Sequence, residues 1–198
     1  MKDTTFITIT RQYGSGGLYI AQAVAKAMGV KCYNREIVAA AAESLDDTAD
    51  IKSVIEKSYD TPNDFLSSIS TLVGNTVPRQ NQMYVQQARI IRELAEGTES
   101  AVFVGRCADY ILRDVPNCYS FFLYADDECR RERAKVYYKD FSFQDVLDVD
   151  KKRKSYYAYY TGRTWGDPQN YELMINTTDI TAEQARDIIL NYVELRQK

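Results

Sequence analysis

The pattern of apolar and polar positions at the start of the chain predicts a strand, a helix and a second strand. Phe6-Ile7-Thr8-Ile9-Thr10 is a run of strand type, and a second short run extends from Val30 to Tyr33. Between these runs, apolar residues recur at helical spacing up to about Met28, and Gly29 follows as a typical helix end. Short connections between a strand, a helix and a strand favour a parallel sheet with right-handed crossovers.

Three later runs complete the predicted sheet. Ala101–Val104 and Tyr119–Tyr124 are dominated by apolar and aromatic residues, which is typical of parallel strands buried on both faces. Leu173–Ile175 has the same character and is the last short strand. The sequence therefore predicts an α/β fold with a parallel sheet of about five strands flanked by helices.

The region from about 35 to 80 carries no strand pattern. It contains an alanine-rich stretch and helix-breaking prolines at Pro62 and Pro78, so we expect a helical lobe outside the sheet. A long helix follows at about 81–96 and ends at Gly97.

Two capping boxes mark the start of later helices. In such a box, two side chains three residues apart satisfy backbone amide groups of the first helical turn. Ser142 with Asp145 opens a helix that reaches about Tyr160, and Thr181 with Gln184 opens the terminal helix.

Length and composition indicate an ordinary soluble protein. A chain of 198 residues is about the size of one domain, so we expect a single domain over 1–198. Its hydrophobic share of 45% and charged share of 27% are typical of globular proteins. No apolar run is long enough to span a membrane, and no signal-peptide pattern precedes the first strand. We therefore expect a cytoplasmic protein that does not bind membranes.

The residue types that are rare here exclude several kinds of chemistry. The chain has no histidine, and its four cysteines form no C-x-x-C pair, which argues against zinc sites and against Ser-His or Cys-His catalysis. The formal net charge of −3 argues against nucleic acid as a partner, because a nucleic-acid-binding domain normally carries a basic face.

A glycine-rich turn, Gly14-Ser15-Gly16-Gly17, follows the first predicted strand and precedes the first helix. Glycines allow backbone amide groups to converge on an anion, and the start of a helix adds partial positive charge. The position is therefore suited to binding phosphate.

Known phosphate-binding patterns fit this turn poorly. The pattern G-x-x-x-x-G-K-[ST] matches only at Gly16, since Arg11 stands at its first glycine, Gly17 at its lysine and Leu18 at its hydroxyl. The dinucleotide pattern G-x-G-x-x-G fails because Tyr19 occupies the third glycine. The pattern alone leaves an anion cradle and a simple turn equally open.

Three segments together resemble the cytidylate kinase-like family of P-loop proteins. They are ITITRQYGSGGLYIAQAVAKAMGVKCYNREIV, VFVGRCADYIL and DKKRKSYYAYYTGRTWGDPQNYELMINTTDI. The resemblance covers nearly the whole chain and is weakest at about 43–80. It implies a P-loop NTPase-like fold, with a helical acceptor-binding lobe at about 35–80 and a lid region at about 140–166.

The resemblance also implies roles for particular residues. Gly14, Ser15, Gly16 and Gly17 would form the variant phosphate loop of this family, in which the lysine is absent. Arg106 would bind the acceptor phosphate, and Asp167 would contact the acceptor nucleoside. Lys152 and Arg153, in the basic run 151–154, would be lid cations close to the donor phosphates.

This chain departs from cytidylate kinases at positions that matter for the site. Cys107 and Asn34 stand where those enzymes have aspartate, and Leu18 offers no hydroxyl to Mg²⁺. We expect ATP and Mg²⁺ to be used, but the sequence assigns no protein ligand to the metal.

Phosphoryl transfer depends mainly on positioning and on cations that neutralise the transferring group. The candidate cations are Arg11, Arg35, Arg106, Arg130, Arg133, Lys152 and Arg153. We assign Arg106, Lys152 and Arg153 to catalysis, Arg11 and the glycine loop to the donor, and Asn34, Arg35, Arg106 and Asp167 to the acceptor.

Purely structural roles are the alternatives for several of these residues. Arg106 could form a salt bridge with Asp109 or Glu36, and at most two of the arginines at 130, 131 and 133 can face inward from one helix. The tyrosines at 156, 157, 159 and 160 are more typical of packing than of base stacking.

Three functions remain open. The first is a small-molecule kinase that transfers the γ-phosphate of ATP to a nucleoside monophosphate such as CMP or dCMP. The second is a nucleotide-binding protein of the same fold with little activity, because losing one oriented charge typically lowers a rate by about 10²–10³. In a kinase, Arg11, Lys152 or Arg153 would have to replace the lysine. The third is a kinase for a non-nucleotide acceptor.

Overall fold

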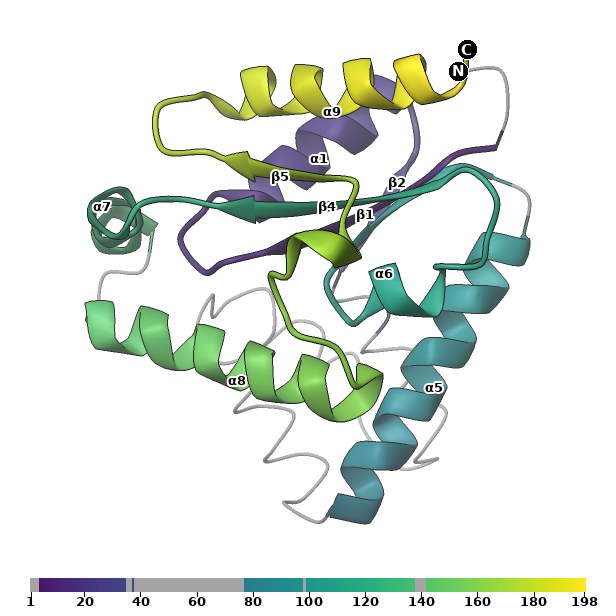
Figure 1. The fold of residues 1–198 in the computed structure, drawn as a ribbon, viewed down its shortest axis with the longest axis horizontal. Coiled ribbons are helices and arrows are strands. Elements are labelled where there is room, and N and C mark those ends of the chain that lie inside the picture. Colours follow the sequence, from purple (N-terminus) through teal and green to yellow (C-terminus); the bar gives the residue numbers. More distant parts are fainter. Residues whose placement is uncertain (1–3, 35–36, 38–76, 98, 138–141) are drawn as a thin grey trace.

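The computed structural model describes residues 4–34, 37, 77–97, 99–137 and 142–198. These residues form a five-stranded sheet in the order β2-β3-β1-β4-β5, with every neighbouring pair parallel (Figure 1). The strands are β1 (Phe6–Arg11), β2 (Lys31–Tyr33), β3 (Ala101–Val104), β4 (Cys118–Tyr124) and β5 (Leu173–Asn176). Because β1 lies in the middle, the loop that follows it lies at the centre of the sheet's carboxyl edge.

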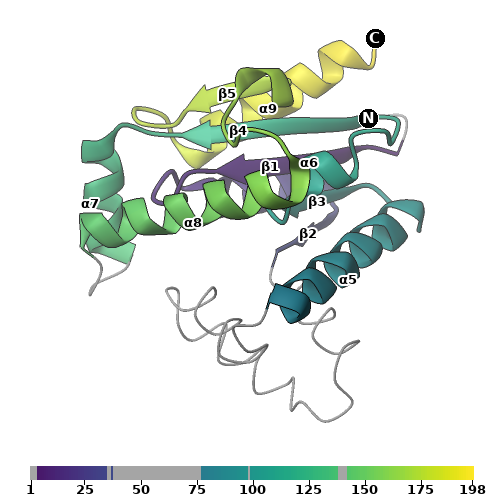
Figure 2. The same ribbon diagram turned by 60° about the horizontal axis from the view of Figure 1, so that its bottom comes forward.

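Helices cover both faces of the sheet (Figures 1 and 2). One face is covered by α1 (Gly17–Met28) and α9 (Ala182–Arg196), and the other by α5 (Val77–Glu96), α6 (Ala108–Ile111) and α8 (Phe143–Thr161). The helix α7 (Asp127–Tyr137) lies beyond the carboxyl end of β4, and the 3₁₀ turn η1 (Pro168–Asn170) precedes β5. The predicted parallel α/β sheet flanked by helices is confirmed.

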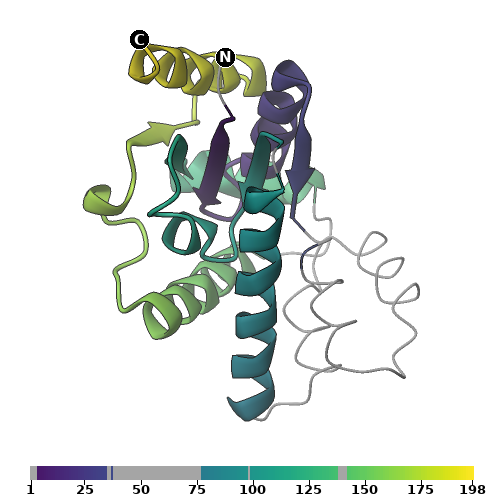
Figure 3. The ribbon, with the colours of Figure 1, turned by 90° about the vertical axis from the view of Figure 1, so that its right-hand side faces the viewer.

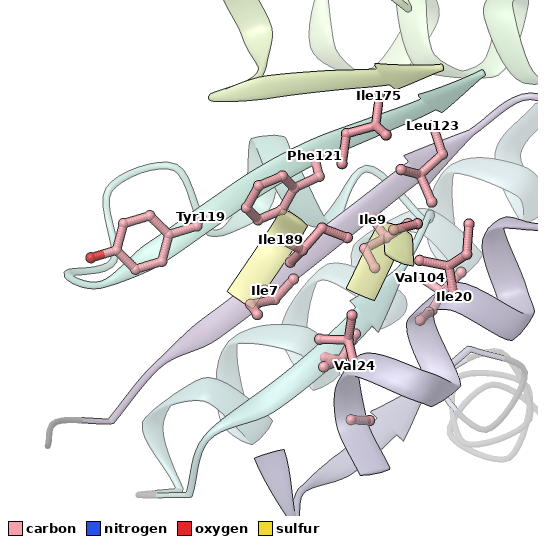
Figure 4. Packing of buried hydrophobic residues seen from close by; sticks show 14 of the residues in the cluster. Ile7, Ile9, Ile20, Val24, Val104, Tyr119, Phe121, Leu123, Ile175 and Ile189 are labelled. Atoms are coloured by element: carbon pink, nitrogen blue, oxygen red, sulfur yellow. The ribbon is translucent and has the colours of Figure 1, made fainter. Parts of the chain in front are cut away.

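Alternation along β1 separates the two cores. Ile7 and Ile9 point toward α1 and α9, where they pack with Ile20, Val24 and Ile189 (Figure 4). The intervening residues of the strand face the other side, since successive side chains of a strand alternate.

The second core is rich in aromatic rings. Phe103 and Phe122 contribute from the sheet, and Trp165 packs edge-on against Phe122 with 5.0 Å between the ring centroids. Trp165 lies four residues after the end of α8, so this contact holds the segment that follows α8 against the sheet.

The two ends of the described chain are close to each other (Figure 3). Gln197, after α9, donates from Nε2 to Oγ1 of Thr5 over 2.7 Å, and Thr5 directly precedes β1. Both ends lie away from the carboxyl edge of the sheet, where the glycine loop is found.

Most predicted helix ends are confirmed. Both capping boxes are present at the starts of α8 and α9, and Gly29 and Gly162 take left-handed conformations that end α1 and α8. The exception is the long helix, which begins at Val77 rather than at about 81. Pro78 therefore lies in its first turn. Proline is tolerated there because N–H groups of the first turn have no helical partner, so the N–H that proline lacks is not needed. Residues 35–36 and 38–76 of the predicted lobe lie outside the described residues.

Candidate phosphate-transfer site

The glycine loop links the end of β1 to the start of α1. Gly14 and Gly16 have φ values of 80° and 76°, which are left-handed conformations that glycine adopts at little cost. Gly16 directly precedes α1, so the first amide groups of that helix open onto the loop. This arrangement favours an anion at the loop.

Polar contacts hold the backbone of the loop in place. The fully buried Ser15 donates from Oγ to the carbonyl of Gln12 over 2.8 Å, and Oε1 of Gln12 accepts the amide of Ala125 after β4. From beyond β5, Thr177 donates from Oγ1 to the carbonyl of Ser15 over 2.8 Å. The Ser15 hydroxyl therefore stabilises the loop, and its role as a donor-phosphate ligand stays a prediction.

A buried ion pair clamps the loop at Tyr13. The amide of Tyr13 donates to Oδ1 of Asp150 in α8 over 2.8 Å, and Nε of Arg130 in α7 donates to the carbonyl of Tyr13 over 2.8 Å. Arg130 and Asp150 are also paired with each other, and their side chains are only 3% and 7% exposed. The Tyr13 ring packs with Ala134 and Val146, between α7 and α8. Arg130, a candidate cation in the sequence, thus has a structural role.

Arg133 brings a second guanidinium of α7 to the loop. Its Nη2 donates to the carbonyl of Thr177 over 2.7 Å, and its Nη1 lies 3.8 Å from the position that a Cβ of Gly16 would take. Arg131 instead forms an exposed pair with Glu128. Two of the three arginines therefore face inward, as the helical spacing allows.

The two predicted lid cations lie in different places. Arg153 is half-buried, and its Nη1 donates to the carbonyl of Arg11 over 3.0 Å. Lys152 lies on the exposed side of α8. The structure therefore brings Arg153, and not Lys152, against the loop.

The second element of the site is the turn Gly105-Arg106-Cys107 after β3. All three residues have left-handed backbone conformations, with φ values of 71°, 61° and 56°. This conformation strains non-glycine residues, and such strain concentrates at functional sites. The amide of Gly105 donates to the carbonyl of Ile9 over 3.0 Å, which places the turn beside β1 and its loop.

A buried carboxyl group, that of Asp109, lies in α6 two residues after the turn. Tyr157 donates from Oη to Asp109 over 2.6 Å, and Thr10 donates to the other carboxylate oxygen over 3.4 Å. Burial raises the pKa of Asp109 above its usual range, although both hydrogen bonds act in the opposite direction. Burial also raises the pKa of the Cys107 thiol, with a further contribution from Asp109, so Cys107 is a neutral thiol at physiological pH.

Three of the four tyrosines of α8, at 156, 157 and 160, pack against other elements, whereas Tyr159 is 64% exposed. The rings of Tyr84 and Tyr160 stack with 4.1 Å between centroids, and Tyr156 contacts both. Tyr160 also donates from Oη to Asn81 over 3.1 Å. Burial raises the pKa of Tyr84 to about 12. These contacts join α5 to α8, which agrees with packing at helical spacing.

Of the remaining acceptor residues, Asn34 and Asp167 lie in the described part of the chain. Asn34 is half-buried after β2, and Arg35 lies outside the described residues. Asp167 accepts the amide of Gln169 over 3.0 Å and so caps η1. Substrate contact by these three residues stays a prediction.

Sequence reasoning missed two residues that hold the loop. Thr177 follows β5, so its place at the carboxyl edge was visible, but its bond to Ser15 was not. Asp150 carried no sequence signal, because an acidic residue in a polar helix normally faces solvent.

The described part of the chain offers no group of three His, Cys, Asp or Glu side chains that could hold a metal ion. At the loop, Ser15 is fully buried with its hydroxyl turned to the Gln12 carbonyl, and Leu18 is apolar, so neither residue offers an accessible oxygen to magnesium. Among the described helices, none has the length and apolar character needed to cross a membrane.

A parallel sheet of this order, with a glycine loop after its central strand and arginines around that loop, defines the P-loop kinase fold. Solved structures agree with this class. An uncharacterized protein from Eubacterium ventriosum ATCC 27560 is similar with 28% identity and a TM-score of 0.73, covering 98% of this chain and 99% of that one. The family model of the cytidylate kinase-like family matches residues 6–179, and the chain belongs to this family.

More distant structures share the fold alone. The shikimate kinase from Bacteroides thetaiotaomicron is 12% identical with a TM-score of 0.58, covering 96% of this chain and 98% of that one. A gluconokinase from Sinorhizobium meliloti 1021 is 13% identical with a TM-score of 0.55, and the match covers 100% of both chains. No curated protein sequence matches the chain.

Proposed function

We propose that this protein is a phosphotransferase that moves the γ-phosphoryl group of ATP to a nucleoside monophosphate, of the CMP or dCMP type. The observation that carries the proposal is that the glycine loop and the arginine turn, each suited to an anion, follow adjacent strands. The glycine loop follows β1 and the arginine turn follows β3, and the hydrogen bond from Gly105 to Ile9 joins the two strand ends. Neighbouring strands lie about 4.8 Å apart, so a donor and an acceptor phosphate would meet there.

The residues of the chain would act mainly by positioning. The loop amides would hold the donor phosphates, and Arg133 and Arg153 would add positive charge from α7 and α8. Arg106 would hold the acceptor phosphate, which its planar guanidinium can bind through two hydrogen bonds. Little covalent chemistry is required of the protein, because the transition state of phosphoryl transfer is stabilised chiefly by charge and alignment.

A different acceptor is the main competing proposal. Structures of shikimate kinase and gluconokinase share this fold, and a fold does not fix the substrate. Family membership favours the nucleotide acceptor. The lack of a lysine and a hydroxyl at positions 17 and 18 favours a weakly active nucleotide-binding protein instead.

Phosphorus NMR distinguishes these functions directly. The protein would be incubated with ATP, Mg²⁺ and a pool of nucleoside monophosphates, beside Arg106→Ala and the exposed control Arg131→Ala. We expect signals of a new nucleoside diphosphate, slowed by about 10²–10³ in Arg106→Ala because one oriented charge is lost, and unchanged in Arg131→Ala.

Other results would replace the proposal. Consumption of ATP only when shikimate or gluconate replaces the nucleotide pool would establish a non-nucleotide acceptor. Binding of a non-hydrolysable ATP analogue without transfer to any acceptor would identify a nucleotide-binding protein.

A further inference from the structure

Two positions of the phosphate loop are exchanged relative to the usual pattern. The pattern G-x-x-x-x-G-K has glycine at its first position and lysine at its seventh. Here the first position is Arg11 and the seventh is Gly17. The cation and the glycine have therefore changed places across the loop.

The structure shows that side chains at positions 11 and 17 would collide, so only one of the two positions can carry a long side chain. A Cβ at Gly17 would lie 2.7 Å from Cβ and 2.7 Å from Cγ of Arg11, which is too close for either residue to accept. The stem of Arg11 thus fills the space in which a side chain at position 17 would begin. Gly17 is not among the residues with positive φ, so its backbone does not itself require glycine.

The far end of the Arg11 side chain points to the acceptor turn. A Cβ at Gly105 would overlap Nη1 of Arg11, so the guanidinium lies against the first residue of that turn. Gly105 directly precedes Arg106, and Arg153 fixes the backbone of Arg11 through its carbonyl. The Arg11 side chain therefore reaches from the glycine loop to the turn that carries Arg106.

We propose that Arg11 supplies the cation of this phosphate loop, from the end of β1 instead of the start of α1. This inference rests on the proposed function and deepens it by naming the group that would contact the transferring phosphoryl. Arginine suits the role because it stays charged and can bind two phosphate oxygens at once.

A double-mutant cycle, measured by melting temperature, tests the steric part of the inference without any ligand. Gly17→Ala should lower the melting temperature by several degrees, because its Cβ meets the Arg11 stem. In an Arg11→Gly background the same change should lower it by at most a degree, since both contacting carbons are gone. An equal loss in the two backgrounds would show that Arg11 does not occupy this space and would overturn the inference.

A binding measurement tests the charge. Arg11→Met keeps an unbranched stem and removes the cation, so calorimetric affinity for inorganic tripolyphosphate should fall by at least tenfold. The control Arg131→Ala should bind as the wild type does. The exchange variant Arg11→Gly/Gly17→Lys should recover most of the affinity, because it restores the usual pattern.

Transfer rates complete the test and separate the two proposals. Phosphorus NMR should show transfer slowed by about 10²–10³ in Arg11→Met and largely restored in the exchange variant. Tripolyphosphate affinity that is lost in Arg11→Met while the wild type transfers to no acceptor would support Arg11 and overturn the kinase. Wild-type affinity and rate in Arg11→Met would overturn Arg11 alone, and a wild type that binds no tripolyphosphate would overturn both.

Discussion

The loop after β1 and the turn after β3 both contain left-handed backbone, but different residue types adopt it in the two elements. Both need left-handed backbone at the carboxyl edge of the sheet. In the loop, glycines at 14 and 16 adopt it, whereas in the turn Arg106 and Cys107 adopt it together with Gly105. Polar contacts to the buried pair Arg130–Asp150 hold the loop. The turn is followed by the short helix α6, in which Ala108 and Asp109 are buried.

The difference follows from what each element contributes. The loop would bind phosphate through backbone amides, so it can use glycine and avoid strain. The turn is proposed to act through the side chain of Arg106, which glycine cannot supply. A non-glycine residue in this conformation costs about 1–3 kcal/mol, so the surrounding structure must hold the turn in place.

The largest expected effect comes from breaking the clamp on the loop. Asp150→Asn would leave Arg130 buried without its carboxylate, and loss of one partner of a buried pair costs about 3–5 kcal/mol. Urea unfolding should show this loss in the free energy of unfolding.

The matched control for the clamp is Asp127→Asn. Asp127 pairs with the same arginine over 3.1 Å, but its side chain is 68% exposed. Exposed pairs contribute about 0–1 kcal/mol, so this change should be small. Equal losses from the two changes would show that the buried pair does not hold the loop.

A smaller effect should reveal strain in the turn. Glycine normally destabilises a protein relative to alanine, but at a left-handed position the order reverses. Cys107→Gly should therefore be more stable than Cys107→Ala by about 1 kcal/mol, measured by thermal or urea unfolding. If alanine proved the more stable of the two, the turn would not be strained at Cys107, and the contrast with the loop would disappear.

The smallest effect concerns the buried carboxyl group of Asp109 in α6. Burial raises the pKa of Asp109 in the folded state, whereas the unfolded chain should keep the usual value of about 3.9. Between these values the folded protein binds the extra proton, so this group makes stability fall as pH rises above about 4. Asp109→Asn removes the titration and keeps an acceptor for Tyr157.

Unfolding measured from pH 4.5 to pH 8 checks this sign. The difference in free energy of unfolding between Asp109→Asn and the wild type should shift in favour of the variant as pH rises. A shift in the opposite direction would mean that the folded state stabilises the carboxylate, so that hydrogen bonds from Tyr157 and Thr10 dominate over burial.

Local sequence signals predicted much of the fold. The strands, both capping boxes and the glycine ends of α1 and α8 depend on residues within a few positions of one another, and they are confirmed. The start of α5 was placed too late, because Pro78 was interpreted as a break and instead occupies the first turn. The sequence also located the glycine loop and Arg106 after strands, which places both at the carboxyl edge.

By itself, then, the sequence determined the order of elements and the edge at which the site lies, since periodicity and caps act over short distances. Only the tertiary structure decided which charges meet the loop. Tyr13 bonds to Asp150, 137 positions later, and Arg153 bonds to the backbone of Arg11. Helical spacing allows several residues of α7 and α8 to face inward, and packing against the loop selects Arg130, Arg133 and Arg153. The place of Arg11 was decided in the same way, because its side chain occupies the space left by the missing side chains of Gly17 and Gly105.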